Sequence, residues 1–391
     1  MQPVLHFSLS IFISAAMIFC IIGVGSLSKF IIKKPFFSPN IFFLFTSGIF
    51  YIAIMSLGMN FIFPLKYISN YFLVFGILLL IINFDIIQDK KKFFFKIFVF
   101  SIIASLMIFK SYSYNDYELY HLPYQKLINS NKIIFGLSNF DYRLGHPSIF
   151  QNISSMFFNK IIGDDSFIFL TPLIMIIFID KLIKIIRKSV YFDVIFICLI
   201  SIIYFLIHGY RYGALGNDMP AHLMSIAGIL ITIEAVRSKK FDHNFISALI
   251  ISLIVISAKI ILVINIILLI FFFKNSWNNF RNLSKTFFLS ILFLIFFFSK
   301  NFINTSCLSF PITFTCFDTL WHSKDYSFFS PKVVSMQSSI AVKDFMNAYE
   351  YHSGGIKDLE IRSKIIKDKN FYEFDLHQRE NYLKFQVLKN Y

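Results

Sequence analysis

The chain alternates long apolar blocks with short polar segments along most of its 391 residues. Most blocks are close to the ~20 residues that an α-helix needs to cross ~30 Å of hydrocarbon. They cover residues 4–28, 41–60, 67–87, 93–109, 165–180, 190–207, 219–236, 245–273 and 286–303. The pattern predicts an all-α polytopic membrane protein.

The block at 245–273 carries a single charge, Lys259, in its middle. One tilted helix would place the basic residues that follow it outside, whereas two short helices meeting near Ala258 would return them to the cytoplasm. The hairpin also places Lys259 at the water boundary rather than in hydrocarbon, where a cation costs at least ~2.5 kcal/mol. We favour the hairpin, which gives about ten transmembrane helices, and keep the single helix as the alternative.

Hydrophobic residues make up 57% of the chain, and its net charge of +15 gathers in short basic clusters at the ends of apolar blocks. Four clusters fall on one side when the spans alternate, as the positive-inside rule expects of cytoplasmic loops. These clusters are 29–34, 88–92, 181–188 and 237–240. Such a distribution argues against nucleic-acid binding, and the apolar blocks make the lipid bilayer the expected partner of the protein.

This orientation divides the chain into a transmembrane domain, residues 1–303, and an extracytoplasmic C-terminal segment, residues 304–391. Two loops of the domain, 110–164 and 208–218, then face outside. The first includes a short apolar stretch, 149–162, which predicts an interfacial helix. We expect a multi-pass protein of the bacterial inner (cytoplasmic) membrane.

The first outer loop opens with several reactive side chains: Asp116, Glu118, Tyr120 and His121. A helix starting near Asp116 would place Glu118 and His121 on one face, at i and i+3. Such a pair suits a general base with an orienting partner. The alternative is structural, with Asp116 as a helix cap and the tyrosines as interfacial anchors.

Further polar groups occur on the same predicted side of the membrane. Arg143 and His146 suit an anion such as phosphate, or belong to a loop packed on the membrane surface. The second outer loop contributes Arg211, Asn217, Asp218 and His222, of which Asp218 can simply cap the following helix. Lys259 is either a further cationic ligand or a snorkelling lysine that helps set topology.

Four cysteines complete the set of candidate groups. Cys20 and Cys198 lie inside apolar blocks, where a thiol packs as a small hydrophobic group. Cys307 and Cys316, nine positions apart in an oxidising compartment, can form a disulfide. Their spacing matches no common zinc pattern, so we predict no metal site there. The sequence specifies no cofactor, and a divalent cation stays open as an alternative.

The order of these features resembles polytopic glycosyltransferases of the GT-C fold, in particular a little-characterised bacterial branch. The resemblance covers about residues 40–322 and differs from many of those enzymes in having no large C-terminal domain and no predicted span after Trp321. The matching positions are Asp116, Tyr120, His121, Gly136, Leu137, Arg143, Gly145, Asn217, Asp218, Lys259, Ser306, Cys307, Phe310, Pro311, Thr315, Cys316 and Trp321.

The resemblance implies transfer of a sugar from a polyprenyl-phosphate donor to a glycan or lipid acceptor at the outer membrane surface. Asp116 would be the general base, with Glu118 or His121 orienting it or the acceptor. Arg143, Lys259 and Arg211 would neutralise the leaving phosphate. Such a donor requires no nucleotide pocket, and the chain has no Gly-rich phosphate loop.

Two other functions stay open. A polymerase or ligase of O-antigen-type polysaccharide is also polytopic, with outer loops rich in Arg and His. A transporter of lipid-linked glycans would place its polar groups at the bilayer midplane, where only Lys259 could lie under the predicted topology.

Overall fold

The computed structural model describes residues 2–32, 36–109, 121–139, 142–146, 148–208, 218–237, 243–259, 262, 265, 280–310 and 312–321. Within these ranges the regular elements are helices, accompanied by two isolated β-bridges. Five described segments are long and apolar enough to cross a membrane: Phe7–Ile31, Ile41–Ile62, Asp164–Lys188, Met219–Arg237 and Leu283–Thr305. The protein is therefore an all-α membrane protein, and its apolar helices suit a lipid bilayer.

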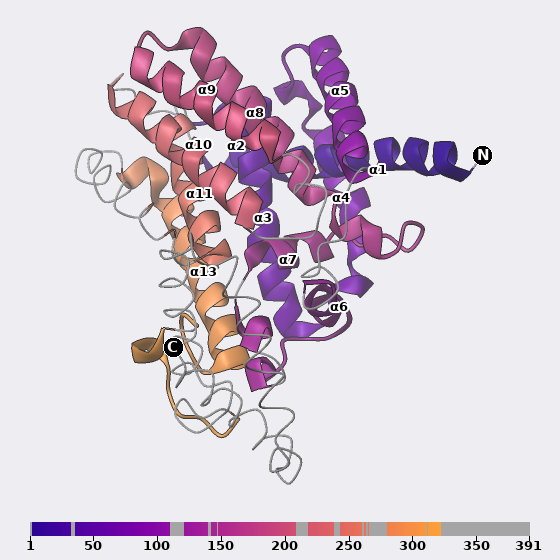
Figure 1. Ribbon diagram of the computed structural model, residues 1–391, viewed down its shortest axis with the longest axis vertical. Coiled ribbons are helices and arrows are strands. Elements are labelled where there is room, and N and C mark those ends of the chain that lie inside the picture. Colours follow the sequence, from indigo (N-terminus) through magenta and orange to yellow (C-terminus); the bar gives the residue numbers. More distant parts are fainter. Residues whose placement is uncertain are drawn as a thin grey trace, which may run out of the picture. The chain divides into compact units, whose positions relative to one another are not determined.

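The helices follow one another along the chain as labelled in Figure 1. The α-helices are α1 (Gln2–Gly25), α2 (Ser28–Ile31), α3 (Ile41–Ile62), α4 (Ser69–Ile82), α5 (Lys90–Phe109), α6 (Leu122–Ser130), α7 (Ile149–Ser155), α8 (Leu170–Lys188), α9 (Phe192–Ile207), α10 (Asp218–Arg237), α11 (His243–Ala258) and α13 (Phe280–Thr305). The 3-10 helices are η1 (Leu65–Tyr67), η2 (Phe84–Ile86), η4 (Leu137–Asn139), η5 (Tyr142–Gly145), η6 (Asp164–Phe167) and η10 (Thr313–Thr315).

Every apolar block of the sequence contains a described helix, although several bounds differ from those expected. The block at 67–87 forms the shorter α4, and α13 begins at Phe280, before the predicted start at 286. α11 ends at Ala258, the position at which the hairpin interpretation places its break. Most of the second half of 245–273 lies outside the described residues, so the total of ten spans stays a prediction.

The chain divides into two compact units. The first comprises Met1–Ile134 and Pro147–Lys300, and the second comprises Phe135–His146 and Asn301–Tyr391. The predicted division after residue 303 stays a prediction, and the inclusion of 135–146 in the second unit was not anticipated. Most of the predicted C-terminal segment, from residue 322 onward, lies outside the described residues.

In the first unit, α1 packs against α3, α4 and α5, while α10 packs against α11 and α8. Glycine permits a close approach between α1 and α3. A Cβ atom added to Gly48 of α3 would lie 1.9 Å from the carbonyl oxygen of Ile21 in α1. Small residues at helix contacts are typical of membrane proteins, because packing rather than hydrophobic exclusion holds their helices together.

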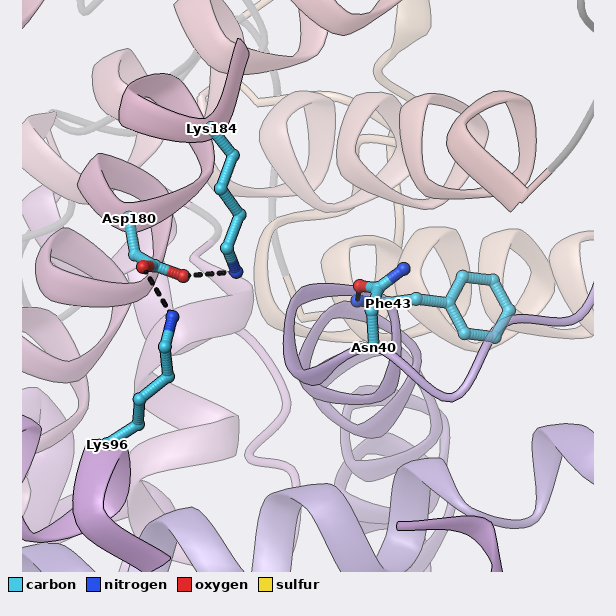
Figure 2. A network of polar contacts seen from close by, with 5 residues as sticks. All are labelled: Asn40, Phe43, Lys96, Asp180 and Lys184. Atoms are coloured by element: carbon cyan, nitrogen blue, oxygen red, sulfur yellow. Dashed lines mark hydrogen bonds and ion pairs between the residues drawn. The ribbon is translucent and has the colours of Figure 1, made fainter. Parts of the chain in front are cut away.

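Basic side chains connect helix to helix where the predicted cytoplasmic clusters lie. Figure 2 shows Lys96 of α5 and Lys184 of α8 converging on Asp180, at 2.9 and 2.5 Å. The same view shows Asn40 capping α3, where its Oδ1 accepts a hydrogen bond of 2.8 Å from the amide of Phe43. The cap satisfies one of the amides left without a partner at a helix start.

Other contacts extend this set, which we call the basic layer: Lys29, Lys96, Lys181, Lys184, Arg237 and Lys285. Lys29 pairs with Asp85 at 2.8 Å, and this hydrogen bond lowers the pKa of the exposed Asp85 carboxyl below its usual value. Arg237 pairs with Asp193 through two hydrogen bonds of 2.6 and 2.5 Å.

Both α11 and α13 begin at the basic layer. Lys181, in the second half of α8, donates to Oδ1 of Asn244 in the first turn of α11 at 2.8 Å. Lys285, near the start of α13, donates to the carbonyl oxygen of Phe30 in α2 at 3.4 Å. Most residues between Lys259 and Phe280 lie outside the described ranges, so the hairpin interpretation of 245–273 stays a prediction.

The segment predicted to lie at the membrane interface is placed differently. It forms α7 over Ile149–Ser155, and all seven of these residues are buried. α7 packs against α3, α6 and α11, and it crosses in front of α3 in Figure 1. An interfacial helix exposes a polar face to water. Here protein covers all of α7, so the exposed polar face expected of these residues is not observed, and the depth of α7 in the membrane stays a prediction.

Candidate functional site

The structure describes only part of the predicted site. Five of its residues lie outside the described ranges: Asp116, Glu118, Tyr120, Arg211 and Asn217. For Arg143 in η5 and Asp218 at the start of α10, only the backbone is described.

Four predicted side chains lie on separate elements. His121 precedes α6, His222 lies in the first turns of α10, and Lys259 directly follows α11, each of them partly buried. His146 is exposed and follows η5 in the second unit. The roles predicted for these residues stay predictions.

The second unit brings together several motifs of the GT-C resemblance. The Gly136 amide donates to the carbonyl oxygen of Ile303 at 2.9 Å. A Cβ atom added to Gly145 would lie 2.9 Å from Cβ of Ser138 and 3.1 Å from the ring of Phe310. Gly145 therefore allows η5 to pack closely on the segment that follows α13.

A disulfide between Cys307 and Cys316 closes this later segment. The cysteines and Phe310 form a small buried cluster. The ring of His146 meets the ring of Phe310 edge to face, with centroids 5.4 Å apart. Trp321 packs against Phe135 in the same manner, at 5.1 Å. The motifs thus serve packing in this unit.

The first unit contains a buried lysine that the sequence analysis did not single out. Lys300 lies near the end of α13 and is only 3% exposed. Its ammonium donates a short hydrogen bond to Oδ1 of Asn152, which is fully buried in α7. The same ammonium lies 5.6 Å from the ring centroid of Tyr124 in α6, a cation–π distance. Both of these groups are neutral.

Further buried amides accompany Lys300. Nε2 of Gln125 in α6 donates to the carbonyl oxygen of Gln151 at 2.7 Å and to Oγ of Ser155 at 2.6 Å, which fixes α6 against α7. Three polar atoms near these contacts have no hydrogen-bond partner among the described residues: Nδ2 of Asn152, Oε1 of Gln125 and Oε1 of Gln151. We call Lys300, Asn152, Tyr124, Gln125 and Gln151 the Lys300 cluster.

α3 positions the cluster at the end distant from its Asn40 cap. Asn60, near the end of α3, donates from Nδ2 to the carbonyl oxygens of Ile128 and Asn131, at 3.4 and 3.0 Å. The Ile133 amide donates back to the carbonyl oxygen of Asn60 at 3.2 Å. These bonds hold α6 beside the end of α3, so the polar face of α6 is directed inward.

The electrostatics of the Lys300 cluster are unfavourable for folding alone. Removing an ammonium from water costs several kcal/mol, which neutral contacts offset only in part. A buried polar atom without a partner adds ~1–3 kcal/mol. Such costs persist mainly where a site serves binding or catalysis, and ionisable groups inside membrane proteins mark functional sites by default.

The sequence carried a signal for this site. Lys300 is a charge within the predicted span 286–303, and Gln151 and Asn152 interrupt an apolar stretch. The missing information was their proximity, since about 150 residues separate Asn152 from Lys300. In the part of the chain that the structure describes, no group of three His, Cys, Asp or Glu side chains could hold a metal ion.

Comparisons with known proteins place the chain in a family. No curated protein and no solved structure matched the sequence. A family model described as "Domain of unknown function (DUF8201)" matches residues 8–364. Because this match covers most of the chain, the protein belongs to that family.

Proposed function

We propose that the protein is a membrane glycosyltransferase with a GT-C-like arrangement of about ten spans in a bacterial cytoplasmic membrane. It would move a sugar from a polyprenyl-phosphate donor to a glycan or lipid acceptor on the outer face. The observation that supports this proposal is the Lys300 cluster. Its α6 residues follow the acidic segment Asp116–His121 directly in sequence. A cationic, amide-lined site suits a sugar phosphate, and the candidate carboxylates of Asp116 and Glu118 lie outside the described residues.

In this mechanism the carboxylate of Asp116 takes the proton of an acceptor hydroxyl. The acceptor oxygen bonds to the anomeric carbon as the bond from that carbon to the phosphate oxygen breaks, and polyprenyl phosphate leaves with the bonding electrons. Cationic side chains would stabilise the negative charge that develops on the phosphate.

The depth of Lys300 favours this function over transport. Lys300 follows Lys285 of the basic layer by about 22 Å along α13, at 1.5 Å per residue. That length is about three quarters of the ~30 Å hydrocarbon thickness, so the ammonium belongs nearer the far boundary than the midplane. Transporters place such groups near the midplane. A polysaccharide polymerase or ligase would share the boundary position and differs in its acceptor.

Replacing Asp116 tests the proposal. In the native host, a strain expressing Asp116→Asn should lack the envelope glycan that the wild-type gene restores to a deletion strain, because the amide cannot accept the hydroxyl proton. Mass spectrometry of the envelope glycans measures the loss, and immunoblots of washed membranes confirm equal protein levels.

Asp165→Asn is the matched control. Asp165 is an exposed carboxylate that follows the same predicted outer loop, in η6, and its variant should restore the glycan fully. Normal glycan in the Asp116→Asn strain at normal protein level would refute the assignment of the base.

A further inference from the structure

The Lys300 cluster places two hydrogen-bond donor groups, an ammonium and an amide, close together. Lys300 contributes an ammonium with three N–H bonds, and the hydrogen bond to Asn152 is the one its nitrogen donates within the described residues. Nδ2 of that same Asn152 amide is buried and lacks a partner among them. A cation and a neighbouring amide N–H donor are complementary to an oxyanion.

Folding of the protein does not require a lysine at position 300. A methionine at this position would fill a similar volume without the cost of burying a charge, and replacing buried ionic groups by apolar ones is often neutral or stabilising. The neutral contacts to Asn152 and Tyr124 give the ammonium no compensating negative charge. A negatively charged ligand would provide this compensating charge.

We propose that Lys300 and the amide of Asn152 form the binding site for a phosphate group carried on a lipid. The carrier rests on the proposed function, whereas the preference for an oxyanion rests on the contacts alone. Lys300 follows Lys285 of the basic layer by about 22 Å along α13, so its ammonium belongs nearer the far boundary of the hydrocarbon, where a lipid phosphate lies, than the midplane.

The neighbouring acceptors fit the same ligand. Oε1 of Gln125 and Oε1 of Gln151 are buried and have no donor among the described residues. Acceptor oxygens of this kind bind hydroxyl groups. A phosphate ester with a hydroxylated substituent, such as a sugar, offers both the oxyanion and the hydroxyls.

Binding of polyprenyl monophosphate to the full-length protein in detergent micelles tests the site. Native mass spectrometry gives the dissociation constant for polyprenyl monophosphate, for the uncharged polyprenol and for inorganic phosphate. We expect the wild type to bind the lipid phosphate at least ten times more tightly than polyprenol. Lys300→Met should reduce that affinity at least tenfold and leave polyprenol binding unchanged.

Lys285→Met is the matched control, since Lys285 is an exposed lysine near the opposite end of the same helix. Its affinity for polyprenyl monophosphate should equal that of the wild type. Equal losses in both variants would show a general charge effect and overturn the proposal, as would unchanged affinity in Lys300→Met. A wild type that binds neither phosphate would overturn it as well.

Folding of the variants is measured in parallel. Lys300→Met, and the double variant Lys300→Met with Asn152→Leu, should resist heating at least as well as the wild type, because they remove a buried charge. If both variants unfold, the lysine is structural and the proposal fails. If inorganic phosphate binds as tightly as the lipid and depends on Lys300, the anion site stands and the carrier is free phosphate.

The two proposals fail separately. Asp116→Asn should bind polyprenyl monophosphate normally while losing the glycan. Normal glycan in that variant, together with Lys300-dependent binding, would refute the base and retain the anion site. Loss of the glycan in Asp116→Asn, together with Lys300-independent binding, would retain the transferase and refute the anion site.

Discussion

Lysines inside the apolar helices of this protein differ in the charge of their partners. Lys96 and Lys184 share the carboxylate of Asp180, whereas Lys300 contacts an amide oxygen and an aromatic ring. Paired lysines stabilise helix contacts, and an ammonium with neutral partners is better suited to a ligand. The partner, rather than the lysine itself, therefore indicates the role.

Asp180 offers a direct test of the paired lysines. The Asp180 side chain is 21% exposed, and its removal leaves two ammonium groups facing each other without the carboxylate between them. We expect Asp180→Asn to reduce the free energy of unfolding by ~1–3 kcal/mol, less than for a fully buried pair. Heating in detergent followed by gel filtration measures this loss of stability.

The comparison for Asp180→Asn is Asp193→Asn, since Asp193 also pairs with a residue of the basic layer. Asp193 pairs with Arg237, but its side chain is 55% exposed, and solvent screens exposed pairs, so its loss should destabilise the protein less than the loss of Asp180. A loss for Asp193→Asn as large as that for Asp180→Asn would contradict the distinction by burial.

Helices of this protein approach one another through glycines, and two glycines of α3 respond oppositely to a methyl group. A Cβ atom at Gly48 would meet backbone, 1.9 Å from the carbonyl oxygen of Ile21. A Cβ atom at Gly58 would meet only the ring of Phe296, at 3.1 Å. A ring can move aside, but the backbone of a packed helix cannot do so without separating α1 from α3.

Gly48→Ala should therefore destabilise the protein by ~1–3 kcal/mol through overpacking. Gly58→Ala should be neutral or stabilise by up to ~1 kcal/mol, because alanine favours the helix. The heating assay used for the Asp180 variants also measures these shifts. Equal effects of the two substitutions would show that helix propensity, rather than the α1–α3 contact, governs this position.

At the scale of the whole molecule, the basic layer predicts which chain segments share a side of the membrane. α5 begins at Lys90, and α13 begins close to Lys285, which donates to Phe30. If the layer is cytoplasmic, residues 90 and 285 face the cytoplasm, while residue 140 in the first outer loop faces outside.

Single cysteines at these positions test the topology in intact cells with Cys20 and Cys198 replaced by serine. A membrane-impermeant maleimide should label Phe140→Cys and leave Lys90→Cys and Lys285→Cys unlabelled until the cells are opened. Labelling of Lys285→Cys from outside would instead support a single helix over 245–273. Labelling of all three positions from one side would refute the alternating topology.

The apolar spans were predictable from the sequence because hydrophobic length is a local property. A run of Phe, Ile and Leu excludes water wherever it lies, so each block contains a helix, and the predicted clusters include Lys29, Lys181, Lys184 and Arg237 of the basic layer. The ends of helices were less certain, as the early start of α13 at Phe280 shows. Caps and short-range polar contacts decide those ends.

Tertiary structure alone decided the burial of α7 and the assembly of the Lys300 cluster. Ile149–Ser155 has the composition of an interfacial helix, but α3, α6 and α11 cover it. Lys300 meets Asn152 only because α13 returns past α7 after a long excursion of the chain. The sequence determined that the protein is a bundle of apolar helices with a basic layer, since each helix carries that information itself. Contacts between distant segments depend on packing, and packing created the site.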